Sequence, residues 1–138
     1  MDLLPTNSCY DDALDYLESL ARDPSTAWII RRPDTFLVHG IALMPEQGTQ
    51  PPGTPYAHAW VELADVVIDA GLLDGRRVWF RRPRADYYAH LRIQSVTRYS
   101  MPEALAENRR TGHYGPWKPE YRALLRSKSS TGETVVDV

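Results

Sequence analysis

The sequence contains very little cysteine: Cys9 is the single cysteine among 138 residues. One cysteine cannot form an intrachain disulfide and cannot supply a multi-cysteine zinc site. This composition favours a reducing, cytoplasmic location. It also makes Cys9 conspicuous, because a free thiol serves either in packing or as a reactive group.

Long hydrophobic runs and a strong charge of one sign are also missing. No apolar stretch approaches the ~20 residues needed to cross a bilayer, and residues 1–5 lack the basic and apolar regions of a secretory signal. The 16 basic and 18 acidic residues leave a formal net charge of −2. We therefore expect neither a membrane nor a nucleic acid as the main partner.

Motifs for cofactors are absent from the sequence as well. It contains no glycine-rich phosphate loop, no internal repeat and no pair of histidines at a metal-binding spacing. His58 and Glu62 stand at positions i and i+4, but they fall on a predicted strand, where this spacing does not support a zinc site. We expect no metal and no organic cofactor.

What remains is the composition of an ordinary globular domain. Hydrophobic residues make up 43% and charged residues 25% of the chain, and its length suits one core rather than two domains. We expect a single domain over residues 1–126. Residues 127–138 are largely polar and small, which predicts a flexible C-terminal tail.

The first predicted element is an amphipathic helix over residues 8–22 with Cys9 in its first turn. Asn7-Ser8 is a helix start signal and Asp23-Pro24 ends the pattern. Between them, apolar residues recur at spacings of three and four: Tyr10, Ala13, Leu14, Leu17, Leu20 and Ala21.

Two interpretations of Cys9 follow from its place on this helix. The positive end of the helix dipole favours a thiolate there. Taken alone, however, the position fits a buried structural cysteine better, because free cysteine is among the most buried residue types. Asp11 and Asp12 also oppose a thiolate if they point toward it.

The next segments predict two strands and a loop. Residues 27–32 and 35–44 have strand composition and are separated by the turn signal Pro33-Asp34. His39 shares a face of the second strand with apolar residues, which favours a partly buried, hydrogen-bonded histidine over a ligand or a base. Residues 45–55 include four prolines and two glycines, and they form either a plain surface connection or the border of a substrate cleft.

A hairpin centred on Ala64-Asp65 is the most informative part of the sequence. An even-length loop pairs residue i with residue 129 − i, and alternation then places four residues on one face: His58, Trp60, Glu62 and Asp69. The opposite face is wholly apolar. His58 and Asp69 come out as diagonal neighbours about 7–8 Å apart, within reach of a side-chain hydrogen bond. An odd-length loop would separate them.

The chemistry of this pair suits an activated thiol. A neutral imidazole can take a thiol proton, and a carboxylate on its other nitrogen fixes the tautomer and stabilises the imidazolium. A polar cross-strand pair on an exposed face is the alternative for His58 and Asp69, and Glu62 is a second acid on that face.

The second half of the sequence predicts further elements without a second site. Residues 76–84 include five arginines, which favours a solvated strand end and turn over a basic rim that attracts an acidic substrate. Helices are expected at residues 84–91 and 100–110, the latter capped by Ser100, with a strand at 92–99. Residues 120–126 predict one or two further helical turns.

The order of these residues resembles a known family. A cysteine at the start of a helix, the string His58-Ala59-Trp60-Val61-Glu62 and then Asp69 on the next strand are similar to the transglutaminase-like branch of the papain-like cysteine-enzyme superfamily. The string is also similar to that of bacterial leader peptidases of lasso-peptide maturation. The resemblance covers residues 7–70.

This resemblance implies an α+β fold in which a nucleophile helix packs on an antiparallel sheet. It implies Cys9 as nucleophile, His58 as base and Asp69 as the residue that orients it. The backbone N–H of Cys9 and the side chain of Asn7 are candidates for binding the oxyanion, and Trp60 and Glu62 are candidates for lining a substrate cleft.

The function expected from the sequence is therefore a cysteine hydrolase or acyltransferase that acts on an amide bond of a peptide or protein. Peptidase, deamidase and transglutaminase share the same first half-reaction, and the sequence does not separate them. The alternative is a non-catalytic binding module, of the immunity or adaptor kind, in which Cys9 is structural.

Overall fold

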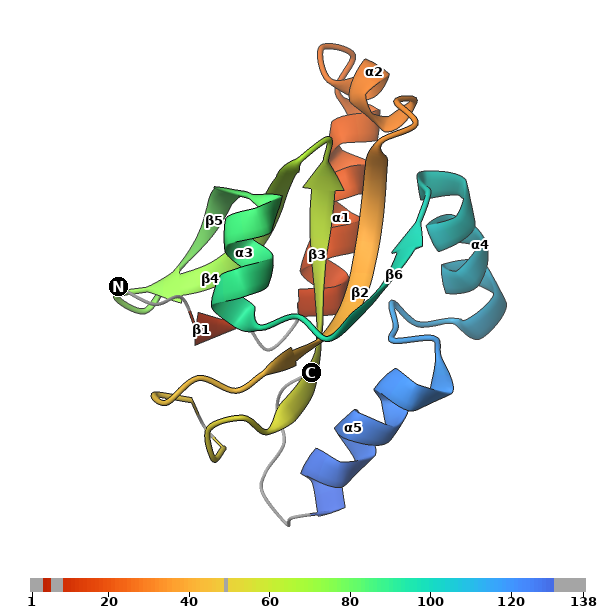
Figure 1. Cartoon of the computed structure of the whole chain (residues 1–138). Coiled ribbons are helices and arrows are strands. Elements are labelled where there is room, and N and C mark those ends of the chain that lie inside the picture. Colours follow the sequence, from red (N-terminus) through yellow and green to blue (C-terminus); the bar gives the residue numbers. More distant parts are fainter. Residues whose placement is uncertain (1–3, 6–8, 49, 131–138) are drawn as a thin grey trace.

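The protein has an α+β fold built on one antiparallel sheet, as a computed structural model shows (Figure 1). The structure describes residues 4–5, 9–48 and 50–130. In chain order the elements are β1 (Leu4–Pro5), α1 (Cys9–Arg22), α2 (Ala27–Ile30), β2 (Thr35–Leu43), β3 (Pro55–Leu63), β4 (Val66–Leu73), β5 (Arg76–Pro83), α3 (Arg84–Leu91), β6 (Ser95–Tyr99), α4 (Met101–Thr111) and α5 (Pro119–Ser130).

The sheet divides at β4. The strand order is β1-β4-β3-β2-β6, and β5 pairs with the other edge of β4. The pairs between β3 and β4 end at Val61 and Ile68, while β1 pairs with β4 further along, at Gly71 and Leu72. β3 and β4 therefore diverge beyond residue 68, and Figure 1 shows the first turn of α1 at the level where they have parted.

Helices cover both faces of this sheet. α1 packs its apolar stripe against one face, where Leu14 and Leu17 join Leu37, Val61 and Ile68 in the largest buried cluster. α3 covers part of the other face, where a second cluster contains Val38, Trp60, Val67 and Tyr87. Figure 1 shows α1 and α3 on opposite sides of the sheet. Since both faces are covered, polar residues on either face must find partners inside the protein.

The register predicted for the central hairpin is confirmed. Val61 pairs with Ile68, Glu62 with Val67 and Leu63 with Val66, so each pair sums to 129 across the two-residue turn. Ala64 takes a left-handed conformation, with φ 57°.

Several predicted elements are also confirmed. The helix at residues 84–91 forms as α3, and Ser100 opens α4 with a capping box completed by Glu103. The Ser100 side chain accepts from the backbone N–H of Glu103, whose carboxylate accepts from the N–H of Ser100. Both otherwise unpaired N–H groups are satisfied at the same helix end.

The strand predicted at residues 27–32 is wrong, because residues 27–30 form the short helix α2. The side chain of Asp23 accepts from the N–H and hydroxyl of Ser25, and the carbonyl of Asp23 accepts from the N–H of Ala27. These bonds turn the chain back toward α1. β2 already pairs with β3 on one edge and β6 on the other, so no edge of β2 remains for another strand.

The C-terminal end also departs from the prediction. α5 runs to Ser130, so residues 127–130 of the expected tail are helical. Residues 131–138 lie outside the described part of the chain. Within the described part, no helix is long and apolar enough to cross a membrane.

Candidate active site

Cys9, His58 and Asp69 come from three different elements that meet where β3 and β4 diverge. Cys9 is the first residue of α1, His58 lies in the middle of β3, and Asp69 is the first residue of β4 beyond its pairs with β3. Because β4 turns away there, the sheet does not separate the start of α1 from the side chain of His58.

The pair formed by His58 and Asp69 is buried and tightly held. Nε2 of His58 lies 2.9 Å from Oδ2 of Asp69, and the two residues are 2% and 9% exposed. A short contact between a ring nitrogen and a carboxylate fixes which nitrogen faces the acid. The imidazole is thus oriented with Nδ1 free for another partner.

That partner is Cys9. A hydrogen bond joins the Cys9 and His58 side chains, and since Nε2 faces Asp69, Nδ1 is the ring nitrogen left for the thiol. Burial lowers the pKa of His58, but the charges of Asp69 and Cys9 and the hydrogen bonds to both outweigh it. The pKa of His58 is raised well above its ordinary value as a result. The geometry therefore favours an imidazolium beside the sulfur.

Tyr87 of α3 is a fourth member of the cluster, and the sequence reasoning missed it. Its hydroxyl donates to Oδ2 of Asp69 at 2.6 Å. Burial and then the charge of Asp69 raise the pKa of Tyr87 well above its ordinary value, which keeps the hydroxyl protonated as a donor. Asp69 thus holds His58 while being held itself by Tyr87. The sequence predicts the helix at residues 84–91 but carries no signal that the hydroxyl of Tyr87 would meet β4.

Tyr56 stands two residues before His58 on the same face of β3. The centroids of the two rings are 6.0 Å apart. Burial is the main reason that the pKa of Tyr56 is raised, with smaller effects from the charges of His58, Asp69 and Cys9. Tyr56 is thus a second tyrosine at the site that the sequence reasoning did not select.

Gly40 makes room for the central aromatic side chain next to this cluster. It pairs with His58 across β2 and β3, and a Cβ placed on it would lie 2.5 Å from the Trp60 ring and 2.8 Å from the carbonyl oxygen of Ser95. Only glycine lets the indole lie against β2 this closely. Trp60 then contacts His58 on β3 and Tyr87 on α3, with ring centroids 5.8 Å and 5.3 Å away.

The expectation that Trp60 and Glu62 line a substrate cleft is corrected by their burial, since both are 0% exposed. Nε1 of Trp60 donates to Oε2 of Glu62 at 3.0 Å, and the Tyr88 hydroxyl donates to the same oxygen. Nε of Arg98 lies 2.9 Å from the other oxygen, Oε1. Arg84 is 3.7 Å from Oε1. Glu62 therefore ties β3 to α3 and β6, and its partners come from segments whose approach the hairpin alone could not predict.

Two sequence candidates for binding the oxyanion remain. Asn7 lies outside the described residues, so the oxyanion role of its side chain stays a prediction. Cys9 is the first residue of α1, where a backbone N–H has no partner within the helix. Among residues 4–5, 9–48 and 50–130, no three acidic, histidine or cysteine side chains group together as metal ligands.

A second buried histidine, His39, lies on the α1 face of the sheet, outside the cluster of Cys9, His58 and Asp69. The sequence predicts a partly buried, hydrogen-bonded histidine, but His39 is fully buried at 0% exposure, and the predicted hydrogen bond is wrong, because within the described chain neither ring nitrogen has a partner. Rings of Tyr10, Tyr99 and Trp117 surround it at centroid distances of 4.8, 5.1 and 4.9 Å. Burial lowers the pKa of His39 to about 3, so it stays neutral near pH 7.

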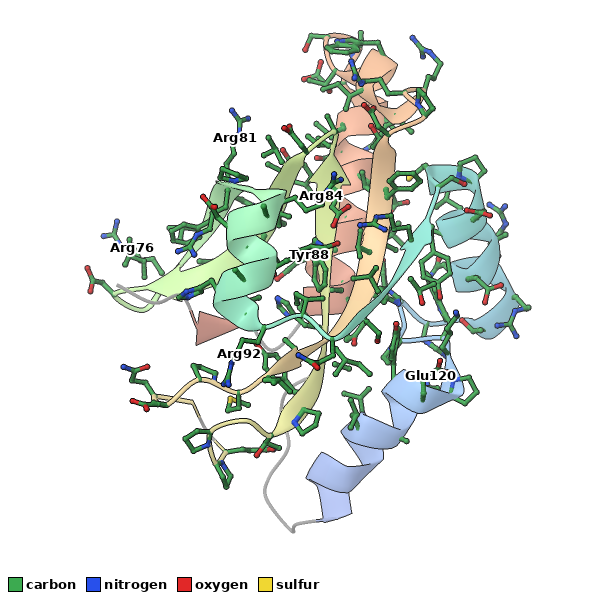
Figure 2. All side chains as sticks on the ribbon, in the orientation of Figure 1. Arg76, Arg81, Arg84, Tyr88, Arg92 and Glu120 are labelled. Atoms are coloured by element: carbon green, nitrogen blue, oxygen red, sulfur yellow. The ribbon has the colours of Figure 1, made fainter. Side chains whose placement is uncertain are left out.

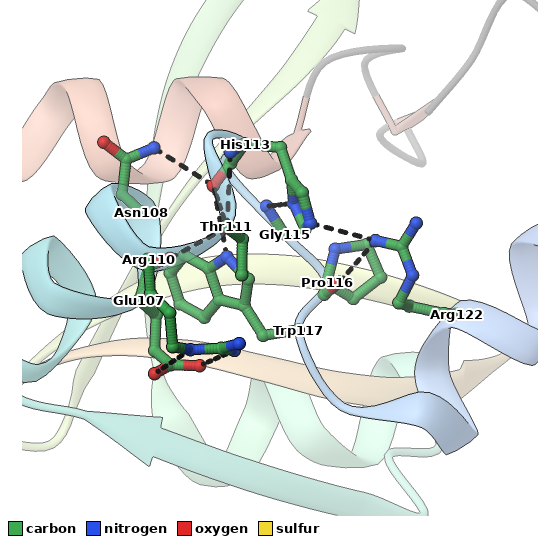
Figure 3. A network of polar contacts seen from close by, with 9 residues as sticks. All are labelled: Glu107, Asn108, Arg110, Thr111, His113, Gly115, Pro116, Trp117 and Arg122. Atoms are coloured by element: carbon green, nitrogen blue, oxygen red, sulfur yellow. Dashed lines mark hydrogen bonds and ion pairs between the residues drawn. The ribbon is translucent and has the colours of Figure 1, made fainter.

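The loop between α4 and α5 closes over His39, and its own polar contacts hold it in shape (Figure 3). The carbonyl of His113 accepts from the side chains of Asn108, Thr111 and Trp117. A Cβ on Gly115 would lie 2.6 Å from the His39 ring. Trp117 is buried in the α1 cluster, so this aromatic segment covers an edge of the core.

Comparisons with known proteins add no relative to this geometry. No family model matches the chain, and neither the curated proteins nor the solved structures give a match. The function therefore has to be argued from the site itself.

Proposed function

We propose that this protein is a cysteine hydrolase or acyltransferase that acts on an amide bond through Cys9, His58 and Asp69. One observation carries the proposal: His58 is fixed by Asp69 at 2.9 Å and hydrogen-bonded to Cys9 on its other side. A nucleophile, a base and a residue that orients the base are the three parts that covalent acyl transfer needs.

The reaction divides into two half-reactions. With the proton of the Cys9 thiol held on His58, the sulfur attacks the carbonyl carbon of the amide. The C–N bond then breaks as the His58 imidazolium protonates the leaving amine, which leaves a thioester on Cys9. Water or a second amine attacks the thioester, His58 accepts its proton, and the thiol is restored. Cys9 opens α1, and the first N–H groups of a helix have no partner within it, so they are the groups available to bind the developing oxyanion.

The arrangement supports membership of the transglutaminase-like branch of the papain-like superfamily. In that family, as here, a helix that begins with the nucleophile packs on an antiparallel sheet, and adjacent strands carry the histidine and the acid. The substrate would be a peptide or protein in the cytoplasm, and the chemistry would require no metal or organic cofactor.

A second function is favoured by the burial of the cluster. Cys9 is 4% exposed and His58 2%, and a polar cluster that only stabilises the fold would be buried in the same way. In that case the protein is a non-catalytic binding module of the immunity or adaptor kind, with Cys9 as a structural residue.

Alkylation of Cys9 separates these two functions. We expect iodoacetamide to label native Cys9 at pH 7 faster than it labels free cysteine, and we expect His58→Gln to remove the excess rate. His39→Gln is a matched control because neither ring nitrogen of His39 has a hydrogen-bond partner within the described residues. A wild-type rate at or below that of free cysteine would support the structural role and oppose the enzyme.

Mass spectrometry then identifies the reaction. The wild type and Cys9→Ala are incubated with a peptide library that contains free amines, and the products are read as cleavage, a gain of about 1 Da for deamidation, or cross-links. Any such product should depend on Cys9. The trapped thioester on Cys9, seen after acid quenching, would connect the product to the proposed intermediate.

A further inference from the structure

The arginine-rich strand β5 is an open edge of the sheet. β5 pairs with β4 along its whole length, and no other strand pairs with it in the described chain. The turn before it has φ 53° at Asp74 and 76° at Gly75, as in a two-residue type I′ hairpin. In such a hairpin the first pair, here Leu73 and Arg76, exchanges hydrogen bonds, and the following pairs alternate.

This alternation identifies the backbone groups that face outward. Counting from the bonded pair at Arg76, the N–H and C=O groups of Arg77, Trp79 and Arg81 point away from β4. Pro83 occupies the next outward position and has no N–H, so it ends the row of donors. β5 thus offers a short, defined stretch for one added strand.

The side chains of the same three residues lie on the α1 face of the sheet. NH1 of Arg77 lies 3.0 Å from Oδ1 of Asp12, and the Trp79 ring lies 4.8 Å from the Tyr16 ring between centroids. Trp79 remains 43% exposed. Because Asp12 is in the first turn of α1, the start of β5 is held beside the turn that carries Cys9.

The charge of this edge is strongly one-sided. Residues 76–84 contain five arginines and no acidic residue. Arg76 and Arg81 are exposed, and Figure 2 shows both side chains extending away from the sheet into solvent. Neither makes an ion pair within the described residues. Arginine on an edge strand repels a second copy of the same edge, so a partner must bring the opposite charge.

We propose that the edge of β5 docks an extended acidic segment of the substrate peptide as an added strand. Residues directly opposite on paired strands share a face. The segment would therefore place an acidic residue opposite Arg81 and an apolar residue opposite Trp79. A second acidic residue would lie opposite Arg77, whose side chain is 55% exposed beside its ion pair with Asp12. The recognised pattern is therefore acidic-x-apolar-x-acidic. This inference names a substrate class for the proposed acyl-transfer function, and it rests on that function in treating the docked peptide as a substrate. The docking itself requires no chemistry at Cys9.

The probe is a fluorescein-labelled peptide of sequence Thr-Glu-Thr-Leu-Thr-Glu-Thr, whose binding is followed by fluorescence polarisation. Cys9→Ala protein is used, so that loss of acyl transfer cannot affect the result. We expect saturable binding that weakens as salt is raised. A peptide with lysine in place of both glutamates, and one with N-methylleucine in place of leucine, should each bind at least about tenfold more weakly.

Variants on the protein side have matched controls. Arg81→Glu should weaken binding by about tenfold or more, while Arg109→Glu, an equal charge change at an exposed position of α4, should leave it unchanged. Trp79→Ala should also weaken binding, whereas Trp28→Ala, at a tryptophan that is 52% exposed, should not. Circular dichroism confirms that each variant is folded.

Several outcomes would overturn the docking proposal. The lysine peptide or the N-methylated peptide could bind as tightly as the glutamate peptide. Arg109→Glu could weaken binding as much as Arg81→Glu does. A single-stranded oligonucleotide of equal charge could bind more tightly than the glutamate peptide. Binding by Cys9→Ala together with an unreactive wild-type Cys9 would instead keep the docking and reject the enzyme. A reactive, catalytic Cys9 without peptide binding would do the opposite.

Discussion

The hydroxyl of Tyr87 and the side chain of His58 both bind Oδ2 of Asp69, at 2.6 Å and 2.9 Å. The carboxylate is therefore positioned from two directions, by α3 and by β3. A carboxylate that accepts from two buried donors keeps its orientation, and it passes that orientation to the imidazole.

Tyr87→Phe tests this relationship. The variant keeps the ring that packs on Trp60 but leaves Asp69 with one buried donor fewer. We expect the free energy of unfolding to fall by about 1–2 kcal/mol and the alkylation of Cys9 to slow several-fold. Urea unfolding and iodoacetamide kinetics measure the two effects.

Tyr88→Phe is the matched control for this variant, because its hydroxyl binds Glu62 rather than Asp69. It should lose stability without changing the reactivity of Cys9. If both variants slowed alkylation equally, Tyr87 would act only through the stability of α3.

Asp69→Asn should remove the negative charge that stabilises the protonated form of His58. The charge of Asp69 and its hydrogen bond both raise the pKa of His58, so that pKa should fall in the variant, and the imidazolium should be lost at a lower pH. We expect acyl transfer to fall by a factor of about 100 or more. The pKa is read from the chemical shift of the His58 ring across a pH series, and an unchanged titration would contradict the assignment of Asp69.

Much of the site could be predicted because its geometry is local. His58 and Asp69 are eleven positions apart on one hairpin, and apolar alternation together with an even turn fixes their common face. The helix that carries Cys9 follows from its apolar stripe and its start and stop signals. These features depend on residues that are near one another in the sequence.

The parts that could not be predicted depend on distant packing. Tyr87 reaches Asp69 only because α3 folds back over the sheet, and nothing within residues 84–91 encodes that approach. Glu62 was predicted to line a cleft because the hairpin alone offers no partner for its carboxylate. Its partner Arg98 lies on β6, which is distant in the sequence. Residues 27–30 have strand composition, yet no strand edge beside β2 was left for them.

Glu62→Gln should destabilise the protein without affecting the chemistry of Cys9. The variant removes the charge that faces Arg98 at 2.9 Å, while the amide oxygen can still accept from Trp60. Because the Arg98 side chain is 36% exposed, solvent reduces the penalty, and we expect a loss of about 1–3 kcal/mol. Urea unfolding measures this loss. Slower alkylation of Cys9 in the folded variant would contradict this prediction and show that Glu62 affects the reactivity of Cys9.

His39 should make the protein sensitive to mild acid. The pKa of His39 is about 3 when folded, whereas an unfolded histidine titrates near 6.5. Unfolding therefore takes up a proton between these values, and the stability contributed by neutral His39 is complete above about pH 6.5 and is lost as the pH falls toward 3. The loss should be about 2 kcal/mol between pH 7 and pH 5.

His39→Phe is the control for this prediction. The variant keeps an aromatic ring among Tyr10, Tyr99 and Trp117 and cannot titrate, so its free energy of unfolding should fall less between pH 7 and pH 5. Because the carboxylates and His58 are common to both proteins, the difference between the two urea-unfolding series isolates the effect of His39. If the two series ran parallel with pH, His39 would be protonated as easily in the folded protein as in the unfolded chain, which would contradict the prediction.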